Sequence, residues 1–242
     1  MTTQQPLFYK QVVPLSYTSH KDLWVTPVND FNHAIETNSL YIAAVEFIKA
    51  SKEYPIFFGK NTDNSFFPVI ILGLKSNTNM FINEKGEWLA SYIPAYVRRY
   101  PFILAGDNSG ENFAVCIDES YTGFNREKKG QQLFTEDGKE SDMLKQSIDF
   151  LKDYQNHIQL TKQFCKDLGE LNLLEAMQAS VTMTDGENYS LGGFWGVNRD
   201  RLKALPAEKL RDLVKSDFME LIYAHLSSQD NLNRLVSKSG KK

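Results

Sequence analysis

Residues 141–169, SDMLKQSIDFLKDYQNHIQLTKQFCKDLG, decide the architecture because their apolar side chains recur at helical spacing. Gly169 is placed to end a helix, since glycine readily adopts the backbone conformation found after a last helical turn. The pattern predicts one long amphipathic helix from Ser141 to Leu168, against which the rest of the chain packs. Its apolar stripe consists of Leu144, Ile148, Leu151, Ile158, Cys165 and Leu168.

Upstream of this helix the sequence changes to short apolar and β-branched runs separated by turn residues. Such runs are typical of strands, so residues 1–120 are expected to be mostly β. A turn glycine, Gly86, stands between two further apolar pairs and predicts a hairpin or tight reversal over residues 83–87. The predicted strands are Tyr41–Ile48, Ile56–Gly59, Phe66–Leu74, Asn79–Ile82 and Asn112–Asp118.

Downstream of the helix, apolar and polar residues alternate from Met177 and again from Tyr189, which predicts a β-hairpin with one apolar face. Pro206 then opens a helical pattern that continues almost to the C-terminus. Residues 140–242 are therefore expected to be rich in helix. The loop Gly123–Lys139 is the only candidate boundary, and it is short. We expect one α+β domain over residues 1–242.

Composition excludes several classes of function. The chain has 242 residues, with 27 basic and 30 acidic side chains and a net charge of −3, which argues against a duplex-binding protein. The longest apolar run, Phe66–Leu74, is too short to cross a bilayer, and the N-terminus does not show a signal-peptide pattern. Cys116 and Cys165 do not form a CxxC motif. We expect a cytoplasmic protein without membrane insertion and leave its oligomeric state open.

The motifs of common enzyme classes are missing from the sequence, including the phosphate-binding loop, the dinucleotide fingerprint and the GxSxG nucleophile elbow. The four histidines are scattered and do not show metal-ligand spacing, so we expect neither a metal nor another cofactor. Two glycine-rich stretches have structural interpretations: residues 106–110 as an exposed turn, and residues 192–196 as a bulge or a close approach to a ring.

The richest stretch for chemistry is residues 88–102, WLASYIPAYVRRYPF, which places Arg98 and Arg99 side by side among aromatic residues and prolines. Two guanidinium groups near a core require carboxylates or aromatic rings as neighbours. We favour internal pairing with Glu46 and Asp118, which lie in otherwise apolar runs. The alternative is a clamp for an anionic ligand. Stacking of single-stranded nucleic acid has weak support, because further basic residues are missing nearby.

If the stretch is functional, its ligand-binding residues come from several segments of the chain. An enzyme acting on an anionic or peptide substrate would require the imidazole, the carboxylates and the guanidinium pair to converge on an open cleft. We therefore leave catalysis open and lean towards a binding protein. The candidate ligand-binding residues are His20, Glu46, Trp88, Tyr92, Arg98, Arg99 and Asp118.

The same stretch carries a family resemblance. Its specific part is Tyr92-Ile93-Pro94-Ala95 followed by Arg98-Arg99-Tyr100-Pro101-Phe102, and weaker motifs run from Pro14-Leu15 to residues 221–226, LIYAHL. With these motifs the chain resembles the SapC family of bacterial proteins, which is named from a surface-layer gene cluster and is distinct from the similarly named peptide-transporter permease. Family members commonly have a small or aliphatic residue where this chain has Tyr96.

The resemblance implies an association with surface layers. The resemblance also implies that, in many bacteria, such proteins are associated with genes for outer-membrane receptors, cupin-like proteins and tryptophan-halogenase-like flavoproteins. It does not imply an established reaction. Together with the aromatic-rich first half of the chain, it predicts an accessory or binding protein that works with a protein or peptide partner in surface-layer or outer-membrane uptake systems.

Overall fold

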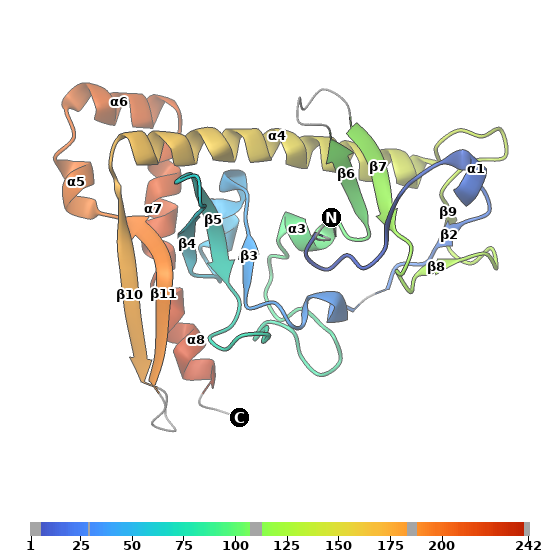
Figure 1. The fold of residues 1–242 in the computed structure, drawn as a ribbon, viewed down its shortest axis with the longest axis horizontal. Helices are drawn as coiled ribbons and strands as arrows, with labels where there is room; N and C mark the ends of the chain where they lie inside the picture. Colours follow the sequence, from blue (N-terminus) through green and yellow to red (C-terminus); the bar gives the residue numbers. More distant parts are fainter. Residues whose placement is uncertain (1–5, 29, 107–112, 183–187, 240–242) are drawn as a thin grey trace.

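The computed structural model describes residues 6–28, 30–106, 113–182 and 188–239, and over these residues the fold is mixed α+β. Its most prominent element is helix α4, Asp142–Glu170, which runs along one side of the whole molecule with the sheets lined up against it (Figure 1). Ser141 caps the helix by accepting a hydrogen bond from the Leu144 N–H at 3.2 Å. The predicted long helix is confirmed.

The largest sheet lies against the C-terminal half of α4. Its strands are antiparallel and follow the order β10-β11-β4-β5-β3. The predicted hairpin corresponds to β10 and β11, although the tip of its turn, residues 183–187, lies outside the described residues. The strand bounds are β3 Ser39–Tyr41, β4 Ile56–Lys60, β5 Phe66–Ile71, β10 Leu174–Thr182 and β11 Asn188–Val197.

Gly193 explains the irregularity of this hairpin. Met177 pairs with Phe194 and Ala179 with Leu191, so a single residue of β10 faces two glycines of β11. Gly193 has a φ of +83°, a left-handed conformation that glycine adopts without strain. The bulge expected from the glycine-rich stretch is therefore confirmed.

Two smaller antiparallel sheets lie towards the N-terminal end of α4. The first has the order β1-β7-β6, and the second has the order β8-β2-β9. Strands β8 and β9 belong to the segment expected to be a connecting loop, which instead pairs on both sides of β2. Their bounds are β1 Val12–Pro14, β2 Trp24–Val25, β6 Phe102–Gly106, β7 Phe113–Asp118, β8 Phe124–Asn125 and β9 Gln131–Gln132.

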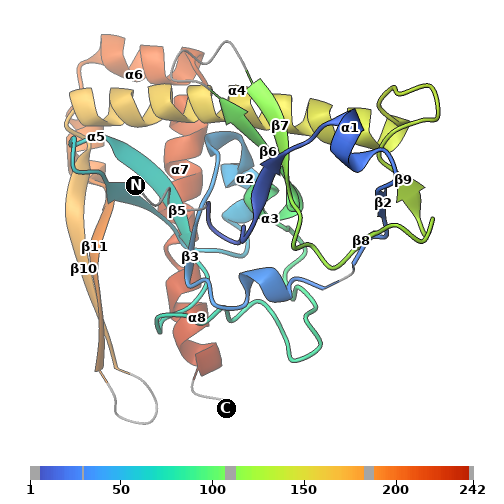
Figure 2. The same ribbon diagram turned by 45° about the vertical axis from the view of Figure 1, so that its right-hand side comes forward.

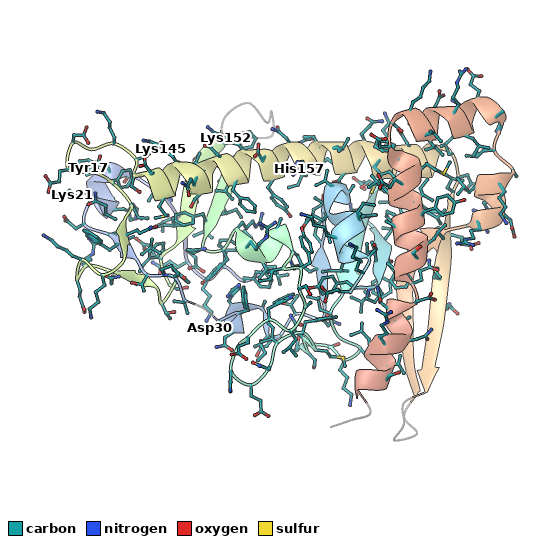
Figure 3. The ribbon with its side chains drawn as sticks, turned by 180° about the vertical axis from the view of Figure 1, so that it is seen from behind. Tyr17, Lys21, Asp30, Lys145, Lys152 and His157 are labelled. Atoms are coloured by element: carbon teal, nitrogen blue, oxygen red, sulfur yellow. The ribbon has the colours of Figure 1, made fainter. Side chains whose placement is uncertain are left out.

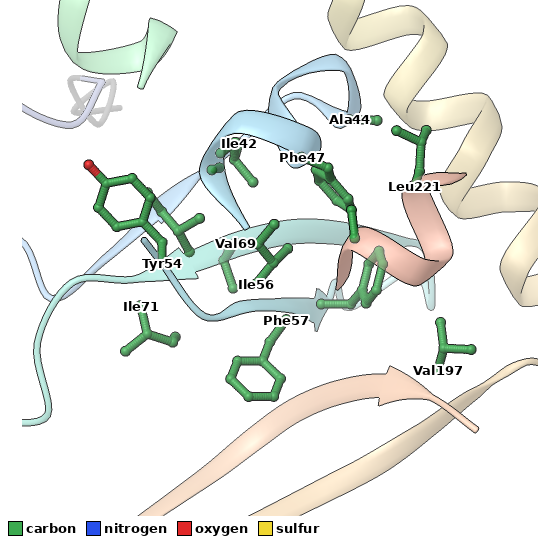
Figure 4. Close-up of a cluster of buried hydrophobic side chains, with 14 of the residues drawn as sticks. Ile42, Ala44, Phe47, Tyr54, Ile56, Phe57, Val69, Ile71, Val197 and Leu221 are labelled. Carbon is green, nitrogen blue, oxygen red and sulfur yellow. The ribbon is translucent and has the colours of Figure 1, made fainter. Parts of the chain in front are cut away.

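The C-terminal helices complete the fold. Pro206 precedes α6 as predicted, and α7 crosses close to β4 and β11, where its buried face meets the main core (Figure 4). This core includes fully buried Phe47, Phe58 and Ile222. The helix bounds are α5 Arg199–Lys203, α6 Ala207–Lys215, α7 Phe218–Ser228 and α8 Asn231–Ser239. No helix among the described residues is long and apolar enough to cross a membrane.

The predicted strand Tyr41–Ile48 is wrong over most of its length. After β3 the chain forms a 3₁₀ turn, η2 (Ala44–Glu46), and a short helix, α2 (Phe47–Ala50). The Ala44 N–H donates to the Thr161 hydroxyl of α4 at 2.8 Å, a contact across 117 residues. A short apolar run is compatible with helix or strand, and here tertiary contacts decide between them.

The end of α4 and the predicted strand at residues 79–82 also differ from the prediction. Gly169 lies inside α4, and Asn172, with a φ of +51°, is the residue that adopts the left-handed conformation beyond the helix end. Residues 79–82 do not form a strand; Ile82 makes only an isolated bridge to Trp88. That bridge closes the predicted reversal, in which Gly86 has a φ of +78°.

Candidate functional site

An open cleft of about 290 Å³ lies beside the arginine pair. One wall comes from the short helix α3, Ala95–Arg98, and the chain that follows it, and consists of Arg98, Arg99 and Phe102. The other wall comes from the first half of α4, which passes over α3 (Figure 2). We call this feature the arginine cleft. Its described lining contains two cations and no acidic side chain.

Helix α4 contributes one face to the cleft, with Met143, Gln146, Ser147 and Phe150 separated by three, one and three residues. This spacing places all four side chains on one side of a helix. Lys152 is exposed and falls on the opposite side (Figure 3). The buried stripe that anchors α4 therefore fixes which of its side chains face the arginines.

Arg98 is held by its neighbours without a carboxylate. Its Nε–H donates to the carbonyl of Ile93 at 3.0 Å. Its guanidinium lies over the ring of Phe150, 5.0 Å from the centroid, and 6.0 Å from that of Tyr92. No ion pair within 4 Å joins Arg98 to any acidic residue in the described part of the chain.

Arg99 is half-buried and surrounded by tyrosines. Its guanidinium stacks on Tyr96 at 3.8 Å from the centroid, with the rings of Tyr154 and Tyr9 at 5.5 and 5.7 Å. Its Nε is buried without a hydrogen-bond partner, as is the Tyr154 hydroxyl. Burial raises the pKa of Tyr154, and the charge of Arg99 only partly opposes that shift. Among the described residues Arg99 has no ion pair either.

Glu46 is buried, but its carboxylate does not bind the arginines as we expected. It accepts hydrogen bonds from the Ala95 N–H and the Tyr92 hydroxyl at 2.7 Å, and from the Ala43 N–H at 3.0 Å. Burial and the charge of Glu46 raise the pKa of Tyr92, which therefore remains a donor. Glu46 thus joins η2 to α3 and fixes the position of the helix that carries Arg98.

Asp118 is fully buried and is also saturated by neutral donors. It accepts from the backbone N–H groups of Lys10 and Gln11 at 2.9 and 3.0 Å, from both the N–H and the hydroxyl of Ser120, and from the Tyr100 hydroxyl at 3.3 Å. Burial opposes its ionisation, but these hydrogen bonds outweigh burial and lower the pKa of Asp118. Its role is to tie the N-terminal segment to β7.

Internal pairing of the arginines with Glu46 and Asp118 is therefore wrong. The prediction counted charged side chains but not the neutral donors, and backbone N–H and hydroxyl groups satisfy both carboxylates. The guanidiniums instead rest on aromatic rings, the other environment in which such groups are tolerated.

The remaining candidates lie outside the lining of the cleft. His20 is buried and within 3.3 Å of the Glu119 carboxylate. Trp88 donates from its indole N–H to the Tyr54 hydroxyl at 2.8 Å, and that hydroxyl donates to the Tyr92 carbonyl. The structure thus brings together Glu46, Tyr92 and Arg98, and it links Trp88 to Tyr92 through the Tyr54 hydroxyl. His20 and Asp118 lie in separate networks.

The acid–base constellation required by the enzymatic alternative is not assembled in the described residues, because only the two arginines among its members line the cleft. No cluster of three or more potential metal ligands occurs in that part of the chain either. Residues 107–110 of the glycine-rich turn lie outside the described residues. Sequence reasoning missed the α4 wall, although the helix periodicity that predicted α4 could have identified that face.

These features define a class: a mixed α+β protein with an arginine pair that lies at an aromatic cleft and has no ion pair among the described residues. The SapC family model matches residues 15–235, and the chain belongs to the SapC family. The match includes both walls of the cleft. Comparisons with curated proteins and with solved structures found no match.

Proposed function

We propose that this protein is an accessory binding protein that receives an anionic group of a protein or peptide partner in the arginine cleft. The observation that carries the proposal is the state of Arg98 and Arg99, two neighbouring cations that border an open cleft without an ion pair among the described residues. Neighbouring guanidiniums repel each other, and an anion between them removes that repulsion.

The lining suits binding better than catalysis. Ser147 is the only described hydroxyl in the lining, and it donates to the Met143 carbonyl at 3.0 Å, so its proton already has an acceptor within the helix. A general base would have to lie within hydrogen-bond reach of such a nucleophile, and the described lining supplies neither histidine nor carboxylate. The aromatic and methionine side chains instead supply apolar contact area, as recognition surfaces do.

The biological setting is a further part of this proposal. The chain belongs to the SapC family, and the resemblance implies an association with surface layers and, in many bacteria, with outer-membrane receptor genes. We propose that the partner belongs to surface-layer or outer-membrane uptake systems. A cytoplasmic location, expected from the sequence, is part of the same proposal.

Site-specific photo-crosslinking in the native host tests this function. A benzophenone amino acid replaces Gln146, which lines the cleft, and in a matched control it replaces Lys152, on the opposite side of α4. We expect a discrete adduct from position 146 only, which disappears when Arg98→Ala is added. Equal adducts from both positions, or an adduct that survives Arg98→Ala, would contradict the proposal.

A further inference from the structure

The size of the arginine cleft limits what it can accept. Sites for drug-sized ligands and cofactors span roughly 300–1,000 Å³. The cleft, at about 290 Å³, lies just below that range. It therefore has room for one charged group together with one side chain of moderate size.

The two guanidiniums are held in place before any ligand arrives. The Ile93 carbonyl and the Phe150 ring fix Arg98, and the Tyr96 ring supports Arg99. A planar guanidinium matches a planar carboxylate, because two parallel N–H groups can donate to its two oxygens. Little side-chain freedom is left to be lost on binding, which favours affinity.

The start of α4 does not add a helix-terminal phosphate-binding element to the two arginines. Phosphate sites usually add free backbone N–H groups at a helix N-terminus to their cationic side chains. At the start of α4 the Ser141 hydroxyl already accepts from the Leu144 N–H, and the first turn carries the Asp142 carboxylate. The helix end nearest the cleft therefore does not provide an additional anion site.

The apolar part of the lining lies beside the charges. Phe102, Met143 and Phe150 line the same cleft as the arginines, and Arg98 covers the Phe150 ring. A ligand that carries an apolar group close to its carboxylate would contact both kinds of surface at once. The last residue of a peptide has this arrangement, with its carboxylate and its side chain on one carbon atom.

We infer that the arginine cleft binds a terminal carboxylate that adjoins one apolar side chain, as at the C-terminus of a peptide ending in phenylalanine, leucine or methionine. This inference rests on the proposed function and names the group that the cleft receives. Capture of a C-terminal carboxylate is a known mode of peptide recognition.

Fluorescence polarisation with short labelled peptides tests the inference. The probe is a hexapeptide of glycine and serine ending in phenylalanine with a free carboxylate. Amidation of that terminus is expected to weaken binding about tenfold or more, as loss of hydrogen bonds to a charged group predicts. Replacing the terminal phenylalanine by glycine is expected to weaken it as well, through loss of apolar contact.

Variants of the intact protein assign the binding to the cleft. Arg98→Ala removes an exposed side chain, so the variant is expected to remain folded, and it should weaken the phenylalanine peptide about tenfold or more. Phe150→Leu should weaken it less. Lys152→Ala removes one positive charge from the same helix and is expected to bind like the unaltered protein, which controls for general electrostatic attraction.

The remaining probes distinguish failure of this inference from failure of the proposed function, and they distinguish a peptide terminus from other anions. Equal binding of the amidated and free peptides would overturn the inference, while the crosslinking experiment at position 146 would still decide the proposed function. Tighter binding of phenyl phosphate than of the peptide would overturn the choice of a carboxylate. Binding of 3-phenylpropionate as tight as that of the peptide would support carboxylate recognition and overturn a peptide terminus as its source.

Discussion

The two buried carboxylates and the two arginines carry opposite charges in neighbouring parts of the fold, and the groups that surround them differ. Glu46 and Asp118 are surrounded by N–H and O–H donors that match their lone pairs. Arg98 and Arg99 have aromatic rings beneath them, an open cleft beside them and no carboxylate within 4 Å among the described residues.

This difference separates charged groups that stabilise the fold from charged groups that can bind a ligand. A buried charge whose hydrogen bonds are all made inside the protein stabilises the fold, and its removal leaves the donors unsatisfied. A charge that has no opposite charge beside it inside the protein contributes less to the fold and remains available to a charged ligand. The comparison therefore predicts large stability effects at the carboxylates and small ones at the arginines.

The largest effect is expected for Asp118→Ala. The substitution removes the buried carboxylate that accepts from the backbone N–H groups of Lys10 and Gln11 and from Ser120, and it releases the N-terminal segment from β7. The free energy of unfolding should fall by about 3–5 kcal/mol, as measured by urea denaturation. Asp137→Ala, which removes an exposed carboxylate paired with Lys139, is the matched control and should change it by less than about 1 kcal/mol.

Glu46→Ala is expected to lower the free energy of unfolding by about 2–4 kcal/mol, because it leaves the Ala43 and Ala95 N–H groups without their acceptor. Since Ala95 begins the helix that carries Arg98, peptide binding should weaken as well. Urea denaturation and fluorescence polarisation on the same preparation measure both effects. Loss of stability with unchanged binding would show that α3 does not depend on Glu46 for its position.

A smaller effect is expected when Asp118 is protonated instead of removed. Its pKa is lowered in the folded protein, so the stabilisation is fully present above the unfolded-state value near 3.9 and is lost as the pH falls through the lower folded value. Urea denaturation between about pH 2 and pH 6 should show stability falling below about pH 4. Asp118→Asn should show a shallower fall; an identical pH profile would assign the fall to other carboxyls.

The long helix and the C-terminal elements could be predicted from sequence because their signals are local. The apolar stripe of α4, the Ser141 cap and the position of Pro206 each act within a few residues. The strand predicted at Tyr41–Ile48 failed because Thr161, far away in the chain, accepts from the Ala44 backbone there. A local pattern does not contain such contacts.

The candidate site was predictable in part for the same reason. Adjacent arginines in an aromatic run marked the correct segment, and aromatic support was one of the two environments that the sequence allowed. The choice between those environments depended on how Glu46 and Asp118 are satisfied, and that is determined by backbone N–H groups from distant segments. The periodicity of α4 could have identified the face that forms the opposite wall, but the contact between this face and the arginine segment is long-range, and a local pattern does not show it.

The most direct test of the central claim is the melting temperature of Arg98→Ala and Arg99→Ala, measured with and without the phenylalanine-terminated peptide. Without peptide, Arg98→Ala should melt within about 2 °C of the unaltered protein, and Arg99→Ala, which loses its contact with Tyr96, should melt no more than about 4 °C lower. A peptide concentration near 100 times the dissociation constant should raise the melting temperature of the unaltered protein by roughly 5–10 °C. That rise should be lost in both variants. A fall of about 10 °C or more in Arg98→Ala without peptide, together with an undiminished peptide-induced rise, would contradict the account and show that the arginines serve the fold.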